Sequence, residues 1–185
     1  MNVSAEIPPS NDRWLKRYYA ARAVFSALWV ALAFTVGKAH PSFGVALIVA
    51  YPAWDCLANY VDAERSGGLR GNLTQTLNVI VSAIVTLAVV VAASRDFHDV
   101  IAVVGIWATL SGLLQLATGV RRWRRAGAQW PMVLSGTQSA LAGAFFVKMA
   151  ADDKATSSVA DVAPYAAFGA LYFAISAVVL VSRRR

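Results

Sequence analysis

Residues 73–94 read LTQTLNVIVSAIVTLAVVVAAS, a run without a single charged side chain. A helix needs about 20 apolar residues to cross the roughly 30 Å hydrocarbon core of a bilayer, so this run is long enough to span it. Five further windows have the same character, and the only charged residues inside them are Arg22 and Asp55. They are residues 18–37, 42–61, 100–120, 130–147 and 162–182. None alternates like a barrel strand, so the sequence predicts an all-α polytopic membrane protein with six transmembrane helices.

The composition of the 185-residue chain agrees with this prediction. Hydrophobic residues make up 58% of it and charged residues only 15%, whereas a soluble domain has about 25% charged residues. Cys56 is the only cysteine, which excludes a disulfide framework. The first dozen residues contain Pro8 and Pro9 and no apolar run. We therefore expect residues 1–12 to form a disordered tail and residues 13–185 to form a single transmembrane domain.

The distribution of lysine and arginine predicts the orientation of the chain. Short loops rich in these residues stay on the cytoplasmic side of a membrane. One predicted side holds 13 of the 17 basic residues, namely Arg13, Lys16, Arg17, Arg22, Arg65, Arg70, Arg121, Arg122, Arg124, Arg125, Arg183, Arg184 and Arg185. The other side holds Lys38, Arg95, Lys148 and Lys154. Both termini are thus predicted to be cytoplasmic, and this sorting accounts for most of the net charge of +7 without nucleic-acid binding.

The basic cluster between the fourth and fifth windows has two interpretations. Arg121, Arg122, Arg124 and Arg125 serve as a topology anchor, or they also attract anionic lipid headgroups at about 1 kcal/mol per cation. The small residues Gly136, Ala140 and Ala144 recur every fourth position and predict a smooth face for helix contact. Packing within the chain and formation of a homo-oligomer both fit that face.

Three windows share a short motif at nearly constant spacing. Ser26, Ser82 and Ser139 are each followed by alanine and an aliphatic residue, and the gaps are 56 and 57 residues. Gly112 and Gly169, which are 57 residues apart, form a weaker match in two other windows. The spacing suggests three copies of a two-helix hairpin, related by an axis along the membrane normal.

Residues 105–146 read GIWATLSGLLQLATGVRRWRRAGAQWPMVLSGTQSALAGAFF. This stretch resembles the HdeD-like family of bacterial acid-resistance membrane proteins in Gly112, the arginine-rich loop after Val120, the aromatic Trp130 and the small residues from Ser135 onward. The resemblance implies a six-helix protein of the bacterial inner membrane that is associated with acid or stress tolerance. It implies no catalytic residue.

Asp55 is the residue that most needs an explanation. An intramembrane carboxylate costs about 2.5–3.5 kcal/mol near the bilayer centre and marks a pathway or a paired site. Tyr51, Asp55, Asn59 and Asp62 fall on one face of their predicted helix. Arg22 lies at a similar depth, about 8–11 Å inside the cytoplasmic boundary at 1.5 Å per residue, so the two charges are able to pair.

Other polar residues fall in the same layer as Asp55, namely Asn59, Asn78, Ser82, Gln115 and Gln138. One interpretation is a polar chamber, at or just beneath the cytoplasmic face, that handles protons or a small solute. The other is structural, because such side chains hold membrane helices together at about 0.6 kcal/mol each and an Arg22–Asp55 pair then acts as a clamp.

The two histidines, His40 and His98, fall in loops on the predicted extracytoplasmic side. Because histidine titrates near pH 6.5, they are candidates for sensing external acid, or they are solvated loop residues.

The sequence favours no enzymatic function. It has no glycine-rich phosphate loop, no histidine pair at ligand spacing and no nucleophile elbow. The spacing of Asp152, Asp153 and Asp161 matches no calcium loop. We therefore expect no catalytic residue, no cofactor and no metal. Two functional hypotheses follow: a non-enzymatic membrane protein that acts as a scaffold, interaction partner or permeability modifier, or a small channel or carrier centred on Asp55.

Overall fold

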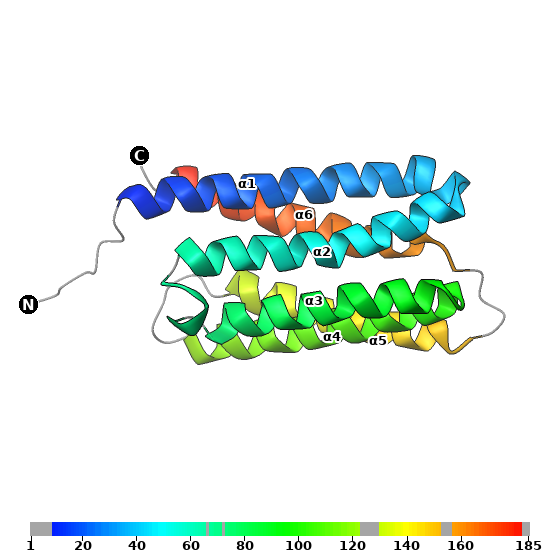
Figure 1. The fold of residues 1–185 in the computed structure, drawn as a ribbon. Helices are drawn as coiled ribbons and strands as arrows, with labels where there is room; N and C mark the ends of the chain where they lie inside the picture. The colour runs from blue at the N-terminus through cyan, green and yellow to red at the C-terminus, as the bar shows by residue number, and fades with distance from the viewer. Residues whose placement is uncertain (1–8, 66, 72, 123–129, 153–156, 183–185) are drawn as a thin grey trace, which may run out of the picture.

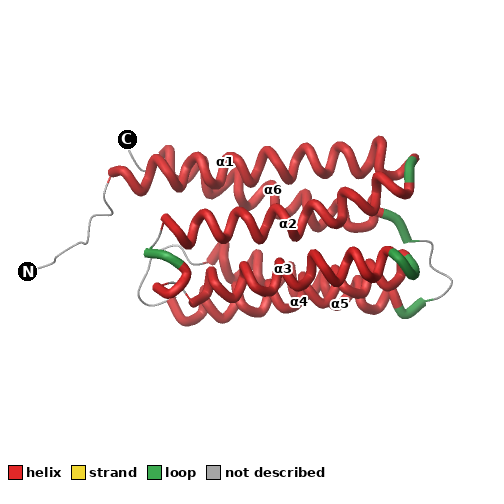
Figure 2. The backbone as a smooth tube through the Cα atoms, viewed as in Figure 1, coloured by secondary structure: helices red, strands yellow, loops and turns green. Residues whose placement is uncertain are grey.

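The computed structural model describes residues 9–65, 67–71, 73–122, 130–152 and 157–182. The long helices are α1 (Pro9–Leu32), α2 (Pro41–Arg65), α3 (Leu73–Ala93), α4 (Phe97–Arg122), α5 (Trp130–Ala150) and α6 (Val159–Ser182). A π-helical turn, η1 (Ala33–Gly37), extends α1, and a short 3₁₀ turn, η2 (Leu69–Gly71), precedes α3 (Figure 1). No strand occurs in these ranges, as the backbone tube shows, so the all-α class is confirmed for them (Figure 2).

Five of the helices are long and apolar enough to cross a membrane: α1 with η1, α2, α3, α4 and α6. Helix α5 is not among those found in the described residues, since polar residues from Ser135 to Ser139 interrupt its apolar sequence. Large apolar side chains cover the outside of the bundle, and Leu87 and Leu141 are 69% and 67% exposed. Soluble proteins rarely expose so much apolar surface. Length, composition and surface thus suit a multi-pass membrane protein in contact with lipid.

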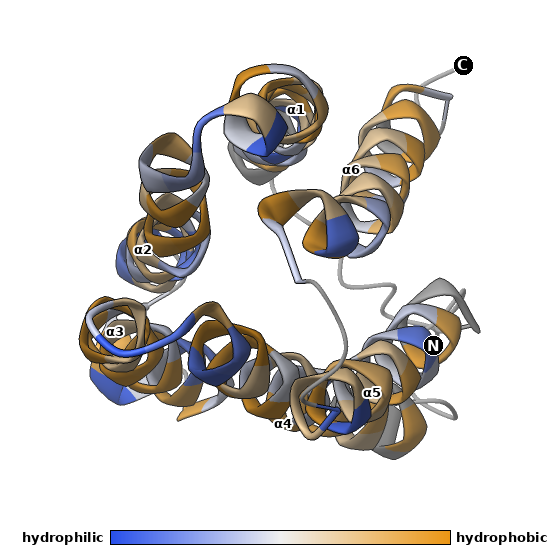
Figure 3. Cartoon of the chain, turned by 90° about the vertical axis from the view of Figure 1, so that its right-hand side faces the viewer, coloured by the Kyte–Doolittle hydropathy of each residue, from blue (hydrophilic) through white to orange (hydrophobic). Residues whose placement is uncertain are grey.

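The six helices follow one another around the bundle in chain order (Figure 3). Helix α6 packs along α1 and closes the ring, and the most extensive packing is between α4 and α5, α1 and α6, and α2 and α3. The pairs α1–α2 and α5–α6 are packed much less extensively. Helix α1 begins and α6 ends at the same end of the bundle, hereafter the terminal end (Figure 1).

The apolar core lies in the half of the bundle away from the terminal end. It is built from the last turns of α1 and α3 and the first turns of α2, α4 and α6, with Trp29, Ile48, Val89, Ile101 and Ala163 nearly inaccessible. The indole Nε1 of Trp29 donates to the backbone oxygen of Leu47 at 2.6 Å, which satisfies the indole donor without water. Most of the polar side chains that line the interior lie in the other half, around Asp55.

Helices α1, α4 and α6 begin before the approximate starts of the predicted membrane spans. Helix α6 begins at Val159, where we expected residue 162, because the Asp161 carboxylate accepts from the backbone amide of Ser158 at 2.7 Å and from its hydroxyl at 3.1 Å. This contact is a form of capping box that starts the helix early and places Pro164 beyond the first turn. Helix α1 begins at Pro9, so the end of the predicted tail 1–12 is helical. Residues 1–8 lie outside the described residues.

Helices α4 and α5 approach each other closely at glycines. A Cβ atom on Gly112 would lie 2.5 Å from the backbone nitrogen of Ala140 and 2.6 Å from the oxygen of Gly136. The predicted small-residue face therefore packs within the chain at Gly136 and Ala140, where α4 covers it.

Candidate functional site

Arg22 and Asp55 form an ion pair in the interior of the bundle, as their predicted depths suggested. Nη2 of Arg22 donates to Oδ1 of Asp55, and the two side chains are only 13% and 17% exposed. Nη1 of Arg22 donates to the hydroxyl of Tyr18 at 2.8 Å, and the guanidinium lies 4.3 Å from the ring centroid of Phe173 on α6. The guanidinium thus connects α1, α2 and α6 in one contact network.

The second oxygen of Asp55 is also satisfied. Oδ2 accepts from Nδ2 of Asn59 at 2.9 Å and from the hydroxyl of Ser82 on α3 at 2.8 Å. A buried carboxylate is tolerated only when an opposite charge and hydrogen bonds replace its water. Asp55 has both, so residues from three helices hold it in place.

A cavity of about 740 Å³, hereafter the chamber, lies between the helices next to this pair. All six helices line it. Its polar lining comprises Arg22, Asp55, Asn59, Asp62, Thr74, Gln75, Asn78, Ser111, Gln115, Ser135, Gln138, Ser139, Asp161 and Ser176, together with several tyrosines. The structure thus brings six of the seven residues of the predicted polar layer to one cavity. The seventh, Ser82, lies behind Asp55 and reaches the site through its hydrogen bond.

The chamber is long and has two different halves. Along α6 its lining extends from Asp161 to Ser176, which corresponds to about 22 Å at 1.5 Å per residue. Most of the polar side chains lie toward the terminal end, and aromatic side chains such as Trp107 and Phe146 line the other half. This length is a large part of the roughly 30 Å apolar thickness of a bilayer.

An aromatic group that we did not predict lies just beyond the ion pair. Tyr51, Trp107 and Tyr165 all line the chamber from even-numbered helices, and the rings of Tyr51 and Trp107 are 6.0 Å apart. They are 56 and 58 residues apart in the sequence, close to the 56 and 57 residues between the repeat serines, and this spacing was the signal that could have identified them.

The three repeat serines contact this group or the carboxylate. Ser26 lies 3.3 Å from the Tyr51 hydroxyl, Ser139 lies 3.0 Å from the Tyr165 hydroxyl, and Ser82 binds Asp55. All three serines are buried. Each therefore forms a polar contact with a neighbouring helix.

Asp62 is the second acid of α2 that lines the chamber. Its Oδ2 accepts from Nε2 of Gln75, whereas its Oδ1 is buried and has no hydrogen-bond partner among the described residues. A buried carboxylate oxygen without a partner is unfavourable and is an attractive position for a cation or a hydrogen-bond donor.

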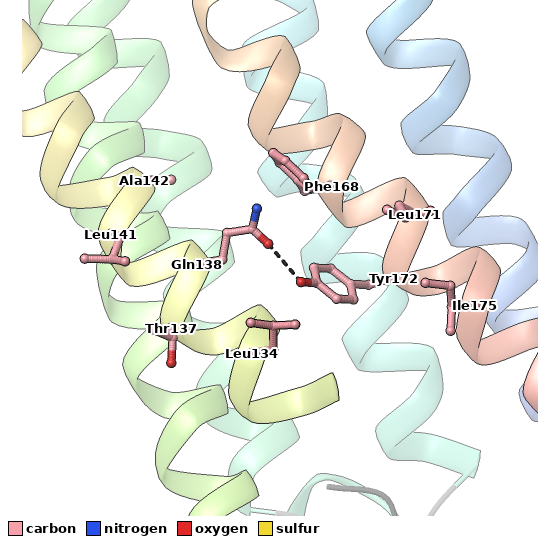
Figure 4. A pocket seen from close by; sticks show the side chains of 9 residues that line it. All are labelled: Leu134, Thr137, Gln138, Leu141, Ala142, Phe168, Leu171, Tyr172 and Ile175. Carbon is pink, nitrogen blue, oxygen red and sulfur yellow. Dashed lines mark hydrogen bonds between the residues drawn. The ribbon is translucent and has the colours of Figure 1, made fainter. Parts of the chain in front are cut away.

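A second, apolar groove lies between α5 and α6 and has a volume of about 670 Å³ (Figure 4). Leu134, Leu141, Leu171 and Ile175 form much of its wall. Gln138, Ala142, Phe168 and Tyr172 line both this groove and the chamber. The hydroxyl of Tyr172 donates to Oε1 of Gln138 at 2.9 Å and joins the two helices where the cavities adjoin (Figure 4).

Of the two histidines predicted in loops, only His40 lies in one, and neither histidine lines the chamber. His40 is exposed between η1 and α2, and His98 is in the first turn of α4. The backbone amide of His98 donates to Oδ1 of Asp96 at 2.9 Å, which lowers the pKa of the Asp96 carboxyl below its usual value. Asp96 thus acts as the N-cap that starts α4 three residues before the predicted residue 100.

The structure describes only part of the predicted arginine cluster. Arg121 and Arg122 end α4, and Arg124 and Arg125 lie outside the described residues, so the role of this cluster stays a prediction. Where the structure describes the chain, no group of three metal-binding side chains occurs.

Comparison of the chain with known families, curated proteins and solved structures found no match.

Proposed function

We propose that this protein is a multi-pass inner-membrane protein that conducts protons or a small solute through the chamber around Asp55. One observation carries the proposal, namely a cavity of about 740 Å³ to which all six helices contribute lining residues. A packing clamp requires only the Arg22–Asp55 contact, and empty space in a core reduces stability. Polar side chains around such a space inside an apolar bundle are typical of a solute pathway.

The membrane topology is part of the same proposal. Six helices, including α5, span the bilayer as three hairpins with the terminal end in the cytoplasm. The excess of lysine and arginine at that end supports this orientation. Packing is most extensive between successive hairpins, at α2–α3, α4–α5 and α6–α1, which supports a threefold repeat.

A second candidate function is a non-enzymatic scaffold or permeability modifier that acts in acid or stress tolerance. The resemblance of residues 105–146 to the HdeD-like family favours it. The saturated hydrogen bonding of Asp55 favours it too, because Arg22, Asn59 and Ser82 leave neither oxygen of the carboxylate without a partner. The two functions differ in whether neutralising Asp55 abolishes transport.

Flux measurements in liposomes distinguish these functions. Proton and small-ion flux is measured with the purified protein at external pH 7 and pH 4 for the parent, Asp55→Asn and Glu64→Gln. Glu64 is an exposed acid on the same helix that does not line the chamber, so its variant is a matched control. We expect flux above protein-free liposomes in the parent and Glu64→Gln and background flux in Asp55→Asn. Background flux in the parent at both pH values would instead favour the scaffold.

Water accessibility tests the chamber itself. Single cysteines at Asn59, Asn78 and Gln115, in a Cys56→Ala background, are treated with a membrane-impermeant thiol reagent. We expect all three to react, because these side chains line a space large enough for water. Leu87→Cys, on the apolar outer surface, is the control and should stay unmodified. Protection at all three chamber positions would contradict a water-filled path.

A further inference from the structure

The groove between α5 and α6 adjoins the chamber and shares four lining residues with it. Its wall residues Leu134, Leu141 and Leu171 are 51%, 67% and 52% exposed, so they face the acyl chains in a membrane. The side chains of Gln138 and Tyr172 line both cavities and are joined by a hydrogen bond (Figure 4). Helices α5 and α6 are also among the least extensively packed neighbours in the ring. The contact between these helices is therefore the candidate entrance to the chamber for a lipophilic molecule.

The charged side chains that line the chamber indicate which class of ligand it binds. Three acids, Asp55, Asp62 and Asp161, line it, whereas Arg22 is the only cation among the described lining residues. Arg22 is already paired with Asp55. Among the described residues, Oδ1 of Asp62 is buried without a hydrogen-bond partner. The polar half of the lining holds two acids, Asp55 and Asp62, against one described cation, Arg22, so it has an excess of negative charge. A cationic ligand complements this charge, and an anionic ligand does not.

The aromatic lining favours the same ligand. The guanidinium of Arg22 lies 4.3 Å and 5.6 Å from the ring centroids of Phe173 and Tyr18, so this wall already binds a cation on ring faces. Tyr51, Trp107 and Tyr165 add further rings to the lining. Aromatic faces bind organic cations such as quaternary ammonium groups. A volume of about 740 Å³ falls within the roughly 300–1,000 Å³ of pockets for drug-sized molecules.

We propose that the chamber binds lipophilic organic cations, which reach it from the bilayer between α5 and α6, with Asp62 as the counter-charge. This inference rests on the proposed function of the chamber as a solute site. It adds the class of ligand and the direction of access.

A pair of probes of similar shape and opposite charge tests the ligand class. Equilibrium dialysis of the detergent-solubilised protein is carried out with tetraphenylphosphonium and with tetraphenylborate, against detergent alone. We expect saturable binding of the phosphonium only, weakened at least about tenfold by Asp62→Asn and unchanged by Glu64→Gln. Equal or tighter saturable binding of the borate would overturn the proposal. Unchanged phosphonium binding by a folded Asp62→Asn protein would overturn the role of Asp62.

The route is tested with two variants that add the same ring at different places. Ala142→Phe enlarges a side chain that lines both cavities, and Leu28→Phe alters an exposed position on α1. In proteoliposomes, we expect slower phosphonium uptake only in Ala142→Phe. Equal rates would overturn access through the groove. Proton flux that depends on Asp55 without phosphonium binding would refute this inference alone, and binding without any flux would refute the transport proposal alone.

Discussion

Asp55→Ala is expected to destabilise the protein by about 3–5 kcal/mol, the usual cost of removing one partner of a buried ion pair. The variant leaves the Arg22 guanidinium inside the bundle without its counter-charge. It also removes the acceptor used by Asn59 and Ser82. The measurement is the free energy of unfolding in mild detergent, with Glu64→Gln as the control that alters an exposed acid of the same helix.

The double variant Arg22→Leu/Asp55→Leu tests whether the stability lost in Asp55→Ala comes from leaving the Arg22 charge buried and unpaired. Replacing a whole buried pair with apolar residues is often neutral or stabilising. We therefore expect the double variant to recover most of the stability that Asp55→Ala loses. A loss below about 1 kcal/mol in Asp55→Ala, the size of an exposed pair, would contradict the burial of this contact. The double variant should nonetheless fail to transport, since transport is proposed to require the carboxylate.

Gly112→Ala is the second change from which we expect a large effect. The added methyl group would lie 2.5 Å from the backbone nitrogen of Ala140 and 2.6 Å from the backbone oxygen of Gly136. Backbone atoms cannot move away as a flexible side chain does, so α4 and α5 must separate. Overpacking of a core typically costs about 1–3 kcal/mol, and this contact should reach or exceed the upper value.

The control for this prediction is Gly71→Ala. A Cβ atom at Gly71 would meet nothing within 4 Å, and the backbone there is not in the left-handed region. Thermal unfolding of the two variants in the same detergent compares them directly. Equal melting temperatures would show that the close approach of α4 and α5 is not needed. Because both helices line the chamber, we also expect the phosphonium affinity to fall in Gly112→Ala only.

The position of polar groups along each helix could be read from the sequence. Counting residues inward from Arg17 and Asp62 placed Arg22 and Asp55 at a similar depth, about 8–11 Å inside the predicted cytoplasmic boundary at 1.5 Å per residue, and the structure pairs them. The same counting placed Asn78, Gln115 and Gln138 in that layer, and all three line the chamber. The method works because a helix rises by a constant 1.5 Å per residue and the bilayer defines where each span begins.

The residue at which each helix begins, and the side of each helix that faces the chamber, were harder to predict from the sequence. The contact between Ser158 and Asp161 moved the start of α6, because side-chain hydrogen bonds to the backbone, and not hydropathy, determine where a helix begins. Tyr51 was predicted on the face of α2 that carries Asp55, but Trp107 and Tyr165 were not grouped with it. An aromatic residue in an apolar window fits a lipid-facing position and an interior position equally well.

The sequence by itself determined an all-helical architecture with helices long and apolar enough to span a membrane, the approximate bounds of those helices and the similar level of Arg22 and Asp55 along α1 and α2. These properties are local to one helix and follow from apolar length and helix geometry. Only the tertiary structure decided that the helices form a ring in chain order, that all six line one chamber, and that an apolar groove meets it between α5 and α6. The physical reason is that neighbours are selected by the fit of surfaces, such as Gly112 against Ala140, and such fit depends on two helices at once.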